Sequence, residues 1–374
     1  MNVKYPIGIQ NFESLRKDGY IYVDKTALMY QLVDSGRYYF LSRPRRFGKS
    51  LLISTLEAYF EGKRELFEGL AVEKLEKDWV KRPVLHLDLN TQKYDTPESL
   101  ENILNAALTR WEQIYGSEPS EVGPALRFQG IIRRARELTG HRVAILVDEY
   151  DKPMLQAIGN EELQNEFRST LQAFYGALKT MDGSIKFTLM TGATQLGKMS
   201  MPNNFMDISM DKRYAELCGI TEQELRDNFN EDINQLAQAE DMTNNEVYAK
   251  LKEYYGGYHF EENSVGIYNP FSLLNTFNLM QFGNYWFEIG TPAYLVELLK
   301  QHHYDLHRIE NVETDADALV NIDYSSINPI PLIYQNGYLS IKDYDRRFRL
   351  YRLGFPNREV EEGFKKFYQN KDQQ

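Results

Sequence analysis

The first half of the chain alternates short apolar runs with longer segments in which apolar residues recur every three or four positions. The apolar runs have the length of strands and occupy residues 20–23, 38–41, 84–89, 142–147 and 185–191. The periodic segments predict helices over residues 27–35, 48–60, 97–115, 123–139 and 161–181. Strands that alternate with helices of this length predict an α/β fold, in which a parallel sheet carries helices on both faces.

Beyond about Cys218 this alternation ends and helical signals dominate. Thr221 opens a segment with the sequence of a capping box, and Thr243 or Asn244 opens a further helix. We expect helices at residues 221–239, 243–255, 269–280 and 291–302. One short hairpin is expected at residues 256–268. We therefore expect an α/β domain over residues 1–217 and a helix-rich lid or C-terminal region over residues 218–374, with a winged-helix-like arrangement as one alternative.

Composition narrows the function classes. A formal net charge of −11 argues against a protein that coats nucleic acid through a globally basic surface. The basic cluster Arg133, Arg134 and Arg136 keeps local DNA binding as an alternative. The single cysteine, Cys218, excludes an internal disulfide and suits a reducing cytoplasm. No apolar run reaches the roughly 18 residues of a membrane span, so we expect a cytoplasmic protein with no membrane partner.

The segment Gly48-Lys49-Ser50 follows an apolar strand and opens a helix, which is the context of a phosphate-binding loop. A helix that starts here directs unpaired backbone N–H groups and its positive dipole end at an anion. Lys49 adds a charge for the β- and γ-phosphates, and Ser50 adds a hydroxyl for Mg²⁺. The pattern G-x-x-x-x-G-K-[ST] would place its first glycine at position 43, where this chain has Arg43.

Two later strands end in residues that suit the same chemistry. Asp148 and Glu149 follow the apolar run 143–147, at the edge where open α/β sheets bind ligands. Asp148 would hold Mg²⁺ through water and Glu149 would activate the attacking water, unless the pair is only a solvated strand end. Thr191 or Thr194, after the strand 185–191, would sense the γ-phosphate, and a plain exit from the strand is the alternative.

Three arginines flank the loop and allow several roles. Arg43, Arg45 and Arg46 could be phosphate contacts, charge donors to another subunit, or surface cations, and we favour nucleotide contact by Arg45 or Arg46. The expected nucleotide-binding residues are consecutive: Arg45, Arg46, Phe47, Gly48, Lys49, Ser50 and Leu51. The histidines His302, His303 and His307 lack the neighbours of a metal site and suit an exposed helix end.

Several motifs together resemble one bacterial family, the AAA-ATPase-like proteins found in bacteria such as Bacteroides. These motifs lie at residues 6–12, 22–26, 42–50, 146–153, 255–260 and 268–270. Members typically carry Arg-Pro-Arg-Arg-Phe-Gly-Lys-Ser at the loop, so the resemblance makes Arg43 the family's own form. It implies an ATP-binding P-loop core over residues 1–217, related to AAA+ and STAND ATPases. It often implies a C-terminal PD-(D/E)XK nuclease-like domain as well.

This chain departs from the family pattern in two places. The segment 197–205 looks shorter than its family counterpart. The tail carries no Asp…Glu-x-Lys strand pair, so we expect the nuclease-like domain to be absent or truncated and assign no nuclease activity.

Two hypotheses follow from the sequence. The first is an Mg²⁺-dependent ATPase, in which Lys49 holds phosphates, Ser50 and Asp148 hold the metal, and Glu149 and Thr191 serve hydrolysis. Hydrolysis would then reset the helical C-terminal region. The second is a nucleotide-gated interaction module with little turnover, which recruits a protein or DNA partner. The sequence leaves the oligomeric state open.

Overall fold

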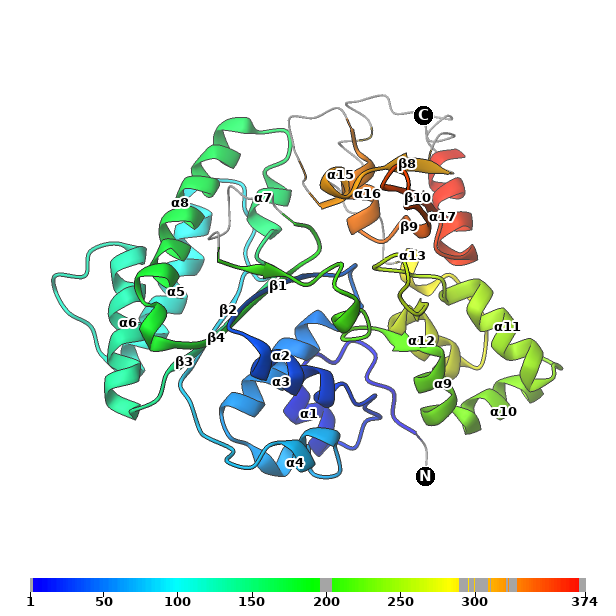
Figure 1. Cartoon of the computed structure of the whole chain (residues 1–374), viewed down its shortest axis with the longest axis horizontal. Helices are drawn as coiled ribbons and strands as arrows, with labels where there is room; N and C mark the ends of the chain where they lie inside the picture. The colour runs from blue at the N-terminus through cyan, green and yellow to red at the C-terminus, as the bar shows by residue number, and fades with distance from the viewer. Residues whose placement is uncertain are drawn as a thin grey trace. The chain divides into compact units, whose positions relative to one another are not determined.

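The computed structural model describes residues 3–195, 204–288, 295, 299, 309, 311–320, 322 and 328–369. By compactness the chain divides into two units, which Figure 1 shows with the chain coloured from end to end. The sheet unit comprises residues 26–42 and 52–208. The helical unit comprises residues 1–25, 43–51 and 209–374. The two domains predicted from the sequence, over residues 1–217 and 218–374, stay a prediction.

The sheet unit is built on five parallel strands in the order β2-β3-β4-β1-β5. Their bounds are β1 Tyr38–Ser42, β2 Val84–Asp88, β3 Val143–Asp148, β4 Ile185–Gly192 and β5 Met206–Asp207. The helices of this part of the chain are α2 Thr26–Ser35, α3 Lys49–Phe60, α4 Ala71–Leu75, α5 Pro97–Tyr115, α6 Pro124–Thr139, α7 Lys152–Gln156 and α8 Glu161–Thr180, with 3₁₀ turns at Arg64–Phe67 and Asp182–Ser184. Figure 1 shows α5, α6 and α8 on one side of the sheet and α2, α3 and α4 on the other. The predicted α/β fold is therefore confirmed.

The strand order brings the ends of β1, β3 and β4 to one edge of the sheet. β4 lies between β1 and β3, and Ser42 at the end of β1 pairs with Gly192 at the end of β4. Asp148 at the end of β3 pairs with Asp88 at the end of β2. All six residues of β3 are buried, as the unbroken apolar run 143–147 predicts for a strand covered on both faces.

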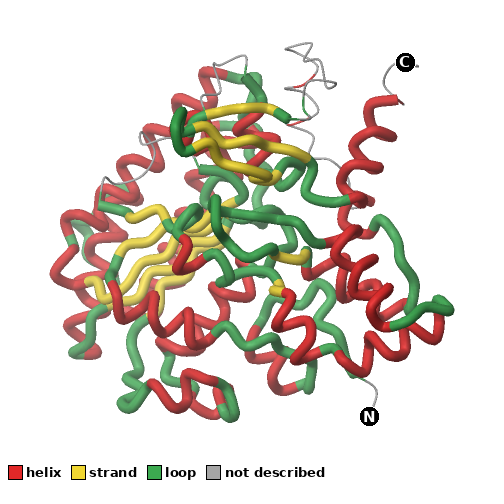
Figure 2. The backbone as a smooth tube through the Cα atoms, turned by 45° about the vertical axis from the view of Figure 1, so that its right-hand side comes forward, coloured by secondary structure: helices red, strands yellow, loops and turns green. Residues whose placement is uncertain are grey.

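The helical unit combines the N-terminal segment with most of the second half of the chain. Its helices are α1 Phe12–Lys17, α9 Glu222–Asn228, α10 Asn230–Ala239, α11 Asn244–Tyr255, α12 Pro270–Leu279, α13 Tyr285–Glu288, α15 Ala316–Val320, α16 Ile330–Gln335 and α17 Arg358–Gln369, with a 3₁₀ turn at Lys212–Tyr214. Its strands are β6 Ile220–Thr221, β7 Ile267–Tyr268, β8 Val312–Thr314, β9 Ser340–Asp345 and β10 Leu350–Gly354. Strands β8, β10 and β9 form an antiparallel sheet, which we did not predict. Figure 2 draws the strands of the chain in yellow.

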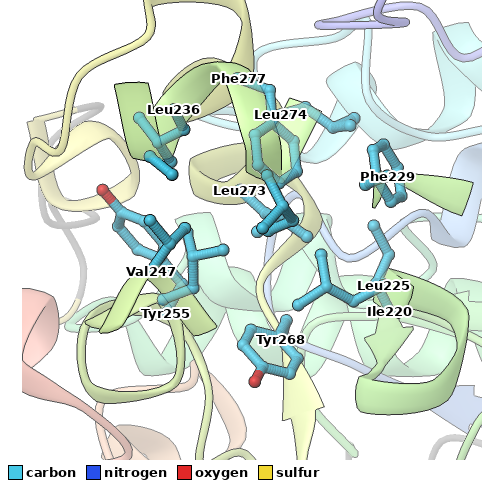
Figure 3. Close-up of a cluster of buried hydrophobic side chains, with 13 residues drawn as sticks. Ile220, Leu225, Phe229, Leu236, Val247, Tyr255, Tyr268, Leu273, Leu274 and Phe277 are labelled. Atoms are coloured by element: carbon cyan, nitrogen blue, oxygen red, sulfur yellow. The ribbon is translucent and has the colours of Figure 1, made fainter. Parts of the chain in front are cut away.

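A hydrophobic cluster holds α9 to α12 together (Figure 3). Phe229 stacks on Phe277 with ring centroids 5.2 Å apart, and both side chains are fully buried. The N-terminal segment packs against the same cluster through partly buried apolar side chains such as Tyr5. Two polar contacts also hold this segment: the Tyr5 hydroxyl donates to Asp232, and Lys25 forms an ion pair with Glu224. These contacts explain why residues far apart in the sequence form one compact unit.

Several local predictions are confirmed and others are wrong. The predicted capping box at Thr221 is present, and Thr243 rather than Asn244 caps the next helix, also with a capping box. The predicted strand 20–23 is reduced to one bridge from Tyr20 to Lys4, and the predicted helix 221–239 is interrupted at Phe229. In the expected hairpin, Tyr258 bridges Ile267, but β7 pairs mainly with β6. Most of the expected helix 291–302, the three clustered histidines and most of the segment 197–205 lie outside the described residues.

Candidate functional site

The loop after β1 turns sharply before α3 begins at Lys49. Gly48 has a φ of 100° and Arg46 has a φ of 67°, so two of the last three residues before the helix leave the usual backbone region. Only glycine adopts such angles without steric cost, so the strain at Arg46 is a specific feature of this loop. Turns of this kind, followed by a helix N-terminus, are used to direct backbone N–H groups at anions.

The Lys49 ammonium lies against its own loop. Its Nζ donates to the carbonyl oxygens of Arg43 at 3.0 Å and Pro44 at 3.3 Å, and the side chain is buried. A buried ammonium requires polar partners, and a phosphate that enters the loop would be a stronger partner than a neutral carbonyl. Contact of Lys49 with a phosphate stays a prediction.

Arg43, at the position of the missing glycine, is an internal anchor. Its guanidinium donates to the carbonyl oxygens of Ser209 at 2.8 Å and Tyr214 at 3.2 Å, and its side chain is 1% exposed. It also lies 4.0 Å from the centre of the Phe260 ring. None of the three roles left open for Arg43 fits these contacts. The sequence could not reveal this role, because the partners are more than 160 residues away.

The other predicted nucleotide-binding residues differ in how far their side chains are exposed to solvent. Arg46 is exposed, with its guanidinium 5.3 Å from the Phe271 ring centre, whereas Arg45 is half-buried. The Phe47 ring is buried 4.8 Å from that of Tyr258, so only the backbone of Phe47 could meet a ligand. Ser50 and Leu51 lie in the first turn of α3 and are half-buried.

Asp148 and Thr191 meet at the edge of the sheet. The Thr191 hydroxyl donates to Asp148 Oδ1 at 2.6 Å, and the backbone N–H of Glu149 donates to the same oxygen at 3.1 Å. Within the described residues, no hydrogen bond ends on Asp148 Oδ2. A carboxylate oxygen left over in this way fits the preference of Mg²⁺ for oxygen ligands and water.

Glu149 ends β3 in a strained conformation. Its φ is 53°, and such a backbone costs a residue other than glycine about 1–3 kcal/mol. Its carbonyl accepts from the backbone N–H of Lys152 at 3.1 Å, which starts α7 immediately after the strand. The left-handed turn takes the half-buried Glu149 side chain out of the alternation of the strand. Backbone strain of this kind persists only where the surrounding structure supports it, and it is concentrated at functional sites.

Thr194, the alternative sensor residue, has a different partner. Its backbone N–H and its hydroxyl donate to Asp151 Oδ2 at 2.6 and 2.7 Å, and both residues are fully buried. Thr194 thus anchors the exit of β4, whereas Thr191 contacts Asp148. We did not predict a role for Asp151. The only signal was its place three residues after Asp148, in a cluster of acidic residues.

His86 lies on β2, the strand beside β3, and contacts a carboxylate from α3. His86 Nδ1 lies 3.0 Å from Glu57 Oε2. Burial lowers the pKa of His86, but the hydrogen bond and charge of Glu57, with smaller contributions from Asp148 and Asp88, outweigh it and leave the pKa raised. The Glu57 carboxylate therefore favours the protonated form of His86. We did not predict it, because a lone histidine in a strand gives no signal.

The basic cluster on α6 is largely neutralised within the protein. Arg134 donates to Glu121 and to the carbonyl of Tyr115, and Arg133 forms an ion pair with Glu118. These internal partners leave less charge for DNA phosphates than the sequence suggests. In the part of the chain that the structure describes, no group of three or more His, Cys, Asp or Glu residues could hold a metal ion. No helix among the described residues has the length and apolar character needed to cross a membrane.

Comparison with known proteins gives two matches. The profile of a family described as "Predicted AAA-ATPase" matches residues 6–202. A protein of Azotobacter chroococcum mcd 1, described as an "Uncharacterized protein in vnfD 5'region", is 38% identical over 364 residues. The aligned region covers 96% of this chain and 68% of that relative.

Proposed function

Because the chain belongs to the predicted AAA-ATPase family, we propose that it binds ATP at the Gly48-Lys49-Ser50 loop and hydrolyses it with the help of Mg²⁺. One observation carries the proposal. β4 lies between β1, which leads into the loop, and β3, so Thr191 and Asp148 meet at the edge at which β1 ends. This is the edge at which parallel sheets bind ligands.

Each residue has a role that its chemistry suits. Lys49 pairs with the β- and γ-phosphates in place of the loop carbonyls, while the backbone N–H groups from Arg45 to Leu51 surround them. Ser50 and Asp148 would hold Mg²⁺ by a hydroxyl oxygen and, through water, a carboxylate oxygen. When bound, Mg²⁺ would neutralise charge on the phosphate oxygens.

Glu149 acts on the attacking water, and Thr191 responds to the loss of the γ-phosphate. Glu149 orients the attacking water and accepts its proton, and its left-handed backbone lies at the end of the strand that carries Asp148. Thr191 donates to Asp148 Oδ1, which would leave Oδ2 for the metal or its water. A change in that hydrogen bond on hydrolysis would report the loss of the γ-phosphate.

The loop belongs to the same compact unit as residues 209–374, which supports a coupling of nucleotide state to the C-terminal region. The alternative function is a nucleotide-gated module with little turnover. It is favoured by the contacts of Lys49 with the Arg43 and Pro44 carbonyls, which a nucleotide must displace. In both cases the loop is the binding site, and turnover separates the two functions.

The test measures ATP binding by calorimetry and phosphate release for the wild type, Lys49→Ala and Glu149→Gln. Lys93→Ala, at a lysine whose side chain is 81% exposed, is the matched control. We expect Lys49→Ala to weaken binding at least about tenfold and Glu149→Gln to lower turnover by about 10²-fold or more with binding retained. Equal affinity for the wild type and Lys49→Ala would refute the site. Wild-type turnover no higher than that of Glu149→Gln would favour the gated module.

A further inference from the structure

The carbonyl oxygen of Arg45 is held by an indole from the C-terminal part of the chain. Trp286 Nε1 donates to it at 3.0 Å, and the Trp286 side chain is 2% exposed. The preceding two carbonyls, of Arg43 and Pro44, accept from Lys49. Three successive loop carbonyls therefore have assigned donors, and Trp286 is the donor that comes from outside the loop.

This hydrogen bond determines the direction of the next backbone N–H. The Arg45–Arg46 peptide bond is trans, so the Arg45 C=O and the Arg46 N–H point in opposite directions. With the carbonyl on the indole, the Arg46 N–H is directed away from Trp286. Arg46 itself has a φ of 67°, an unfavourable angle that this bond helps to maintain.

We infer that Trp286 is a positioning residue for the nucleotide loop. Its indole N–H fixes the Arg45–Arg46 peptide so that the Arg46 N–H faces the phosphates. The inference rests on the proposed function, since the loop must bind a nucleotide for this orientation to matter. Trp286 does not touch the nucleotide and acts only through the loop backbone.

Trp286 is itself held by two helices. Its backbone N–H donates to Glu359 Oε1 at 2.7 Å, and the Ser272 hydroxyl donates to the same carboxyl group, 2.8 Å from Oε2. Ser272 belongs to α12 and Glu359 to α17, so α12, α13 and α17 meet at this carboxyl group. The Trp286 ring also packs 5.2 Å from that of Tyr338. A movement of these helices would be transmitted to the loop through the hydrogen bond of the Trp286 indole.

The backbone near Tyr338 also lies close to the loop. A Cβ added to Gly337 would lie 2.6 Å from Pro44 Cβ, and Gly337 has a φ of 86°. Only glycine permits both this contact and this angle. Other parts of the helical unit thus support the loop at Pro44 by packing and at Arg45 by a hydrogen bond, which restrict how its backbone can turn.

Trp286→Phe tests the inference, because it keeps an aromatic ring and removes the N–H donor. Trp111→Phe, at another buried indole, is the matched control. We expect Trp286→Phe to raise KM and Kd for ATP by about threefold to tenfold with kcat within about twofold. We expect Trp111→Phe to leave both constants unchanged, even if its melting temperature falls. Wild-type affinity in a folded Trp286→Phe protein would overturn the inference.

A second measurement covers the case in which Trp286→Phe does not fold. The chain has three tryptophans, so replacing Trp79 and Trp111 by Phe leaves Trp286 as the only one. We expect its emission to change as ATP binds, at the concentrations that calorimetry gives, and not to change when Lys49→Ala is added. Binding by calorimetry without a change in emission would overturn the inference alone. No ATP binding by the wild type would overturn the proposed function together with it.

Discussion

Restoring the glycine that the phosphate-loop pattern calls for should damage this protein. Arg43 stands at that position, and its buried guanidinium holds the carbonyls of Ser209 and Tyr214 and packs on Phe260. Arg43→Gly removes all three contacts and leaves two buried carbonyls without these donors. The substitution therefore brings the sequence closer to G-x-x-x-x-G-K-[ST] and removes an internal anchor of the helical unit.

The size of the effect follows from the contacts. A hydrogen bond from a charged donor is worth about 1.5–3 kcal/mol, and a desolvated cation–π contact is worth about 2 kcal/mol. The contributions of one side chain are not independent, so we expect a total loss of about 4 kcal/mol rather than their full sum. For a unit of this size, that corresponds to a fall in Tm of about 10 °C.

Urea unfolding followed by circular dichroism measures the loss, and Arg46→Gly is the control in the same loop. Arg46 is exposed and has a φ of 67°, so glycine relieves backbone strain there and the net change should stay within about 1 kcal/mol. If Arg43→Gly unfolded at the same urea concentration as the wild type, the anchoring role would be refuted. A gain in ATP affinity for Arg43→Gly would contradict the view that this side chain lies outside the phosphate site.

Three further predictions concern single groups. Burial raises the pKa of Glu359 from 4.5 to about 7. The folded protein therefore binds this proton more tightly than the unfolded chain, and its stability should fall by about 3 kcal/mol as the pH rises from about 4.5 to about 7. Glu359→Gln should flatten this profile in urea unfolding between pH 4.5 and 8. Glu149→Gly should be about 1 kcal/mol more stable than Glu149→Ala in the same assay, because only glycine relieves the left-handed backbone. Thr191→Val, which loses the hydroxyl bound to Asp148, should lower phosphate release about tenfold and change ATP affinity less than about twofold.

Each of these predictions has an outcome that contradicts it. An unchanged pH profile in Glu359→Gln would show that this carboxyl group does not titrate in the range given. Equal stability of the two Glu149 variants would mean that the backbone there is not strained. If Thr191→Val released phosphate at the wild-type rate, the hydrogen bond to Asp148 would have no part in hydrolysis.

Local sequence signals predicted most of the secondary structure, because helix periodicity, capping and strand burial depend on neighbouring residues. The capping box at Thr221 and the buried strand 143–147 are examples. The predicted helix 221–239 failed at Phe229, which turns into the hydrophobic cluster instead of continuing the helix. The short strands β8 to β10 gave no clear alternation, and they are stabilised by pairing with one another.

The sequence by itself determined the order of strands and helices along the chain, the Gly48-Lys49-Ser50 turn that opens a helix, and the acidic end of the strand 143–147. Each of these features depends on consecutive residues. Only the tertiary structure decided which side chains meet. Arg43 reaches Ser209, Arg45 is held by Trp286, and Thr191 rather than Thr194 contacts Asp148. These pairs are separated by 43 to 241 positions in the chain, and contacts over such distances are set by how the helices and strands pack. The loop can be recognised from its consecutive residues, but the contacts that hold it in place come from residues that are distant in the sequence.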